Sequence, residues 1–124
     1  MSTGSMIFIK VLHVLISESV GFAENVLYGA EISSNDFFGG DLSAGDIYTL
    51  RTIHISKEQK LSIRKLLLAL SRISVVGVLS VIDGMIVSEK LDLPDLSLVD
   101  RNSQKDIADD LPLNEAFYIY ADEE

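Results

Sequence analysis

Hydrophobic residues near the start of the chain are interrupted at helical spacing. The apolar run 7–16 is broken only by Lys10 and His13, which are three residues apart. Polar positions at this spacing lie on one stripe of a helix, so the pattern predicts a mostly buried helix that continues toward Gly29. A transmembrane span needs about 20 apolar residues. Because Lys10, His13 and Glu18 interrupt this run, we predict that it does not span a membrane.

A second helix is predicted to begin after Ser56. Ser56 and Gln59 have the spacing of a capping box, in which each side chain bonds to the backbone of the other residue. Good helix formers follow, with apolar side chains on one face. The opposite face carries the basic residues Lys57, Lys60 and Arg64.

The segment 73–82 has features of both a helix and a strand. Six of its ten residues are β-branched, which favours a buried strand. Ser74, Gly77 and Ser80 recur at every third position and favour a helix with a small-residue face. We prefer the helix, ended by Asp83-Gly84 because glycine accepts the left-handed conformation common after a helix, and we keep the strand as the alternative.

Loop and extended patterns fill much of the remaining chain. Glycine and small polar residues predict a loop at 35–46, and the alternation at 53–55 indicates a short strand or an extended approach to the next helix. Residues 85–99 also have an extended pattern. Pro112 is suited to the start of a last helix, whose apolar face consists of Leu113, Ala116, Phe117 and Tyr120.

Together these elements predict an α+β fold that is mostly helical. We expect one compact domain, residues 6–124, with three to four helices and a small β element. Residues 1–5 precede a second methionine, Met6, and are expected to be an artificial or disordered leader.

Composition restricts the function classes. The chain is 48% hydrophobic, which predicts a folded protein, and its lack of cysteine excludes disulfides and cysteine nucleophiles. The missing cysteines also fit a cytoplasmic location. A formal net charge of −9 disfavours binding to nucleic acid or to an anionic membrane surface and favours a basic protein partner.

The negative charge is concentrated near the C-terminus. Residues 1–88 contain eight acidic and seven basic residues, whereas residues 89–124 contain eleven and three. Two interpretations stay open: the acidic segment lies against the basic helix of its own chain, or it forms a surface for a basic partner. For the second, the candidate partner-binding residues are Asp95, Asp100, Asp106, Asp109, Asp110, Glu115 and Tyr118.

No pattern identifies a catalytic centre. His13 lies in the apolar run, where a helix histidine is the ordinary outcome, and a zinc site would need ligands that the sequence does not nominate. The glycine-rich segment 39–45 lacks the lysine of a phosphate-binding loop. We therefore predict no catalytic residue, no metal and no cofactor.

Two segments carry a resemblance to known proteins. They are Arg72-Ile-Ser-Val-Val-Gly-Val-Leu-Ser-Val-Ile-Asp-Gly84 and Leu113-Asn-Glu-Ala-Phe-Tyr118. They resemble a helix ending in Leu/Ile-Asp-Gly and a C-terminal Phe-Tyr segment in small uncharacterised bacterial proteins. In size and acidity the chain is also similar to the immunity proteins that neutralise bacterial toxins. The resemblance implies no catalytic residue.

Three interpretations of function follow. We expect a non-enzymatic protein-binding domain, most concretely an immunity or antitoxin-like inhibitor that covers a basic toxin surface with its acidic C-terminal region. The alternative is a small enzyme or ligand-binding domain, with pocket candidates His54, Arg51 and Asp83. A third is a structural homodimer that packs through Ser74, Gly77 and Ser80.

Overall fold

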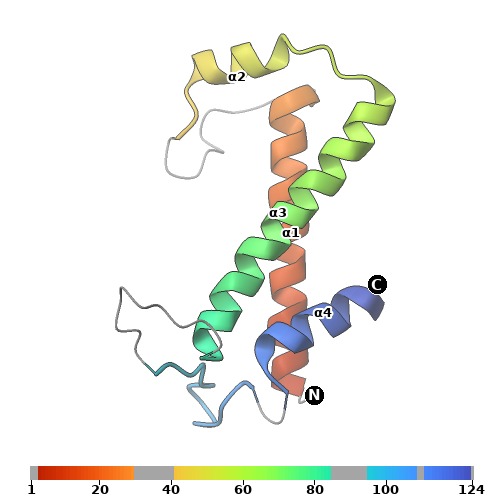
Figure 1. The fold of residues 1–124 in the computed structure, drawn as a ribbon. Coiled ribbons are helices and arrows are strands. Elements are labelled where there is room, and N and C mark those ends of the chain that lie inside the picture. The colour runs from red at the N-terminus through yellow and green to blue at the C-terminus, as the bar shows by residue number, and fades with distance from the viewer. Residues whose placement is uncertain (1–2, 30–40, 85–94, 109–110, 124) are drawn as a thin grey trace. The chain divides into compact units, whose positions relative to one another are not determined.

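Four α-helices account for the regular structure in the computed structural model, which describes residues 3–29, 41–84, 95–108 and 111–123 (Figure 1). Helix α1 spans Thr3–Tyr28, α2 spans Ala44–Arg51, α3 spans Lys57–Ile82 and α4 spans Leu113–Glu123. The chain divides into a first unit, Met1–Leu15 with Ser71–Glu124, and a second unit, Ile16–Leu70. Helices α1 and α3 each contribute residues to both units.

The prediction of a small β element is wrong. The part of the chain that the structure describes contains helices and no strand. Val99 and Asp106 form one isolated antiparallel bridge there. The start of helix α2 is stabilised by a capping box between Ser43 and Asp46, which the sequence analysis missed. Residues 53–55 connect α2 to α3, and most of the segment 85–99 lies outside the described residues.

The helical interpretation of the segment 73–82 is confirmed, because these residues belong to α3. The capping box is also confirmed: the Ser56 backbone N–H donates to Gln59 Oε1 at 2.8 Å, and the Gln59 backbone N–H donates to Ser56 Oγ at 3.1 Å. Since no turn-forming residue interrupts the strong helix formers, the helix propagates through the β-branched run. It ends before Gly84, whose φ of 72° lies in the left-handed region.

In the first unit, one face of α1 is buried. Ser5, Ile9 and His13 are spaced four residues apart and are at most 6% exposed. The Ser5 hydroxyl donates a hydrogen bond to the carbonyl oxygen of Ile107. Helix α1 begins at Thr3, so part of the expected leader is helical and Ser5 packs inside the first unit.

Helix α4 packs against this face of α1, as the blue and red helices in Figure 1 show. The rings of His13 and Phe117 stack with centroids 4.1 Å apart, and His13 Nε2–H donates to the Phe117 carbonyl oxygen at 3.1 Å. The Tyr120 ring lies 5.0 Å from the His13 ring. The predicted apolar face of α4 is confirmed. Tyr120 is half-buried, and the other three residues of this face are at most 1% exposed: Leu113, Ala116 and Phe117.

The start of α4 is capped by Asp83, which follows α3. Its carboxylate accepts the backbone N–H groups of Leu113 and Asn114 at 3.2 and 3.0 Å. The first N–H groups of a helix lack internal acceptors, and the helix dipole favours negative charge at this end. Asp83 therefore connects α3 to α4, which begins directly after Pro112, as predicted.

In the second unit, Arg51 connects α2 to the end of α1. Its Nε and Nη2 groups donate to the backbone carbonyls of Val26 and Asn25 at 3.2 and 2.8 Å. Carbonyls in the last helical turn lack the internal donors found earlier in the helix. Ile16, Val20 and Val26 are the buried apolar residues of this half of α1.

Two neighbouring residues of α4 should differ sharply in their contribution to stability. Phe117 is fully buried, whereas Tyr118 is 51% exposed. Phe117→Ala should lower the free energy of unfolding by about 3–5 kcal/mol because it leaves a cavity beside His13. Tyr118→Ala should lower it by less than about 1 kcal/mol. Chemical denaturation measures both, and equal losses would contradict the described packing of α4.

The cap at Asp83 should also be measurable. Asp83→Ala should lower the free energy of unfolding by about 1–2 kcal/mol, because two N–H groups lose their acceptor. Asp83→Asn should retain part of that stability, since its single amide oxygen can replace one of the two carboxylate oxygens that accept these N–H groups. Asp95→Ala is the control, because Asp95 is exposed. Thermal or chemical unfolding in which Asp83→Ala and Asp95→Ala behave alike would rule out the cap.

Candidate functional site

The predicted partner-binding residues fall into three groups. Asp109 and Asp110 lie outside the described residues, and Asp100 is half-buried. The others are exposed, and their acidic members form no ion pair within the described ranges. These exposed residues are Asp95, Asp106, Glu115 and Tyr118.

Asp100 stabilises a turn. Its Oδ1 accepts the backbone N–H groups of Asn102 and Ser103 at 2.8 and 3.2 Å, and its carbonyl accepts the Gln104 N–H at 2.8 Å. Gln104 adopts a φ of 61°, which is uncommon for a residue with a side chain. The Asp100 carboxylate is therefore engaged in local structure, unlike those of Asp95 and Asp106.

Exposed apolar side chains accompany the exposed carboxylates. Leu96 and Val99 are 43% and 42% exposed, and each lies close in sequence to Asp95. On α4, Tyr118 and Ile119 follow Glu115 by three and four residues, so the three side chains share one helix face. We call this set the C-terminal surface: Asp95, Leu96, Val99, Asp106, Glu115, Tyr118 and Ile119.

Segment 95–108 packs close to the start of α4 in the first unit. The Ile107 N–H donates to the Leu98 carbonyl at 2.8 Å, and the bridge places Val99 opposite Asp106. Leu96 and Asp106 also line a small hollow of about 100 Å³ together with Leu113 of α4. Segment 95–108 therefore lies beside the first turn of α4.

A polar hollow of about 460 Å³ lies at the start of α1 in the first unit. Its lining residues include Asp100, Lys105 and Asp106, so acidic and basic residues both border it. No group of three or more His, Asp or Glu side chains that could hold a metal occurs among the residues that the structure describes.

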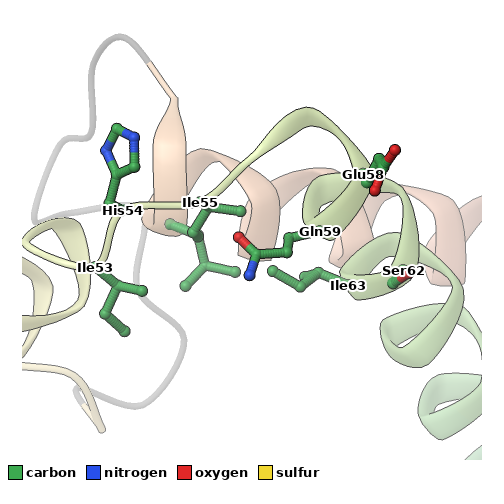
Figure 2. A pocket seen from close by; sticks show the side chains of 8 residues that line it. Ile53, His54, Ile55, Glu58, Gln59, Ser62 and Ile63 are labelled. Atoms are coloured by element: carbon green, nitrogen blue, oxygen red, sulfur yellow. The ribbon is translucent and has the colours of Figure 1, made fainter.

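The second unit contains an open groove of about 530 Å³ between the end of α1 and the start of α3. Ile53 and Ile55 extend to one side of the connecting segment, whereas the imidazole of His54 points to the other (Figure 2). Gln59 lies beside Ile55, with its Oε1 already accepting the Ser56 N–H. The lining residues are Leu27, Ile53, His54, Ile55, Glu58, Gln59, Ser62 and Ile63.

The three pocket candidates, His54, Arg51 and Asp83, have separate roles in the structure. His54 lines the groove, whereas the Arg51 guanidinium binds the carbonyls at the end of α1. Asp83 belongs to the first unit, where its carboxylate caps α4. In the described ranges no hydrogen bond joins His54 to Glu58 or Ser62, so the groove does not contain an assembled acid-base pair.

The basic helix has partners in the second unit. Arg64 forms an ion pair with Glu24 of α1, and the Lys60 ammonium lies 4.8 Å from the centre of the Tyr28 ring. The Tyr28 hydroxyl donates to Glu24 Oε2 at 2.7 Å. Burial and this hydrogen bond raise the pKa of Tyr28. Sequence analysis missed this cluster, although Glu24 and Tyr28 have the four-residue spacing of a helical pair.

The titration of Tyr28 tests this cluster. Because the Glu24 carboxylate holds the phenolic proton and repels the phenolate, Glu24→Gln should lower the pKa of Tyr28. Tyrosinate absorbance measures the change, with each titration compared with the same variant carrying Tyr28→Phe to isolate this ring. An unchanged pKa in Glu24→Gln would contradict the contact.

Comparisons with known proteins identify no relative: no protein-family model, no curated protein and no solved structure matches the chain. The resemblance to small bacterial proteins and to immunity proteins therefore stays a prediction.

Proposed function

We propose that this chain is a non-enzymatic protein-binding module whose C-terminal surface binds a basic protein. The observation that carries the proposal is the combination of exposed apolar side chains with carboxylates that form no ion pair within the described part of the chain. Interfaces typically use such apolar and aromatic side chains for affinity and surround them with polar groups.

Tyr118 is the expected anchor of this interface. The ring of its buried neighbour Phe117 contacts the Tyr118 ring edge to face, with the two ring centroids 6.1 Å apart. This contact helps to orient the exposed Tyr118 ring. A tyrosine offers a large contact area with few rotatable bonds and therefore loses little conformational entropy on binding. Ile119 extends the apolar contact, and Glu115 contributes the negative charge on the same face.

The exposed carboxylates of the C-terminal surface are expected to affect mainly the association rate and the choice of partner. Exposed charges steer an oppositely charged partner and accelerate association, although each exposed ion pair contributes little to affinity. The net charge of −9 disfavours acidic partners. Arg64 and Lys60 pair with Glu24 and Tyr28, so these two basic groups are not partners of Asp95, Asp106 or Glu115.

An inhibitor is the most specific form of this proposal. A small acidic protein can block a basic enzyme, such as a nuclease toxin, by covering the cationic surface that would otherwise bind its anionic substrate. In this form the chain needs no catalytic group of its own. The partner would then lose activity in proportion to its occupancy by the chain.

Charge neutralisation at the C-terminal surface tests the proposal. The variant Asp95→Asn/Asp106→Asn/Glu115→Gln should capture less of a basic partner from a host extract. It should also slow association with the purified partner by about tenfold or more at low ionic strength. Tyr118→Ala should instead accelerate dissociation. Affinity capture with mass identification, followed by binding kinetics at two salt concentrations, measures these effects.

The matched control neutralises three exposed acids elsewhere: Glu18→Gln/Asp41→Asn/Glu58→Gln. It changes the net charge by the same amount but leaves the C-terminal surface intact. Equal losses in both triple variants would show that only the total charge matters. Capture of no basic protein at all would contradict the proposal.

A further inference from the structure

Within the second unit, a glutamate and a tyrosine on one helix face bind two basic side chains of another helix. Glu24 and Tyr28 lie four residues apart on α1. The Arg64 guanidinium forms an ion pair with the Glu24 carboxylate, and the Lys60 ammonium lies 4.8 Å from the centre of the Tyr28 ring. Lys60 and Arg64 are also four residues apart, so both cations come from one face of α3.

Helix α4 carries the same two residue types on its outer face in the first unit. Glu115 and Tyr118 lie three residues apart, a spacing that also brings two side chains together on a helix. Glu115 is exposed, and its carboxylate forms no ion pair within the described ranges. Tyr118 is 51% exposed, and no lysine or arginine that the structure describes lies over its ring. The pair formed by Glu115 and Tyr118 is therefore open to cations from outside the described chain.

The combination of an exposed tyrosine with a carboxylate distinguishes this pair. Tyr48 and Tyr118 are the exposed tyrosines that the structure describes. Ala44 and Gly45 stand four and three residues before Tyr48, and the basic residue Arg51 stands three residues after it. Tyr48 therefore has no carboxylate at helical spacing and serves as a matched control for Tyr118.

Exposed apolar side chains alone do not select a partner. Helices α1 and α3 are both long and apolar enough to cross a membrane by length and composition. On α3, Leu66 and Ile73 are 67% and 66% exposed. A surface of this kind does not distinguish a lipid from another protein. The pair on α4 does select a chemistry, because a carboxylate and the face of an aromatic ring both attract cations.

The surrounding charge also favours a cationic occupant. Residues 89–124 contain eleven acidic and three basic residues. Arg101 and Lys105 are the basic residues of this region that the structure describes, and neither forms an ion pair with Glu115. An approaching cation therefore meets attraction from the whole region as well as from the pair itself.

We propose that Glu115 and Tyr118 receive two basic side chains from one helix of the partner, one on the carboxylate and one over the ring. This inference rests on the proposed function and specifies the structure by which the basic partner is recognised. The two cations stand three or four residues apart, because only that spacing places both on one helix face. Arginine suits the carboxylate, since its guanidinium donates two parallel hydrogen bonds, and either cation suits the ring.

Two alanine-rich helical peptides of identical composition test the proposal. One carries lysine and arginine four residues apart, in the order of Lys60 and Arg64, whereas the other carries them two residues apart, about 200° around the helix. In NMR titrations of the full chain at low ionic strength, the first peptide should bind about threefold or more tightly than the second. The largest shifts should occur at Glu115, Tyr118 and Ile119. Equal affinities, no binding of the first peptide, or shifts centred elsewhere would overturn the inference.

Single variants assign the preference to the pair. Tyr118→Leu keeps an apolar side chain but removes the ring, and Glu115→Gln removes the charge, so each should abolish the preference for the first peptide. Tyr48→Leu should leave the preference unchanged. Circular dichroism checks that the variants and both peptides remain equally helical. A preference that persists in Tyr118→Leu and Glu115→Gln would contradict the assignment.

The outcomes separate this inference from the proposed function. If the triple variant of the C-terminal surface loses a captured basic partner while the two peptides bind the native chain equally, the surface binds its partner without a helical pair of cations. This inference then fails alone. If no basic protein is captured, the proposed function fails and this inference fails with it.

Discussion

The contact between His13 and Phe117 is the interaction on which the first unit depends. Stacking and a backbone hydrogen bond hold α4 against α1, although the two residues are separated by 104 positions. The Asp83 cap holds the start of the same helix. With its inner face fixed in this way, α4 directs Glu115, Tyr118 and Ile119 outward. The histidine and the aspartate are therefore structural, and the proposed binding residues depend on them for their orientation.

Local signals in the sequence predicted much of the helical structure. The spacing of Leu113, Ala116 and Phe117 identified the inner face of α4, and Ser56 with Gln59 marked the start of α3, because both patterns arise within a few residues. Contacts between distant residues have no such signal. The sequence therefore indicated Asp83 as a helix end but not as the cap of α4, and it predicted a loop where Ser43 and Asp46 start a helix.

The distribution of charge could also be predicted only in part. Counting acids and bases along the chain located the acidic region, but it did not distinguish Asp100, whose carboxylate holds a turn, from Asp95 and Asp106, which are exposed. Nor did it predict that Arg64 pairs with Glu24. Periodicity likewise identified α3 as apolar on one side without showing that Leu66 and Ile73 are exposed. Exposure depends on the packing of the whole chain, and it separates candidate interaction surfaces from core.

The most direct test of the central claim is to map the surface that becomes protected when the captured partner binds. Hydrogen exchange of the chain alone and in the complex provides this map, because bound backbone groups exchange more slowly. The proposed function predicts protection concentrated in residues 95–108 and in α4. Protection confined to the groove around Ile53, Ile55 and Ile63, with α4 unchanged, would contradict it.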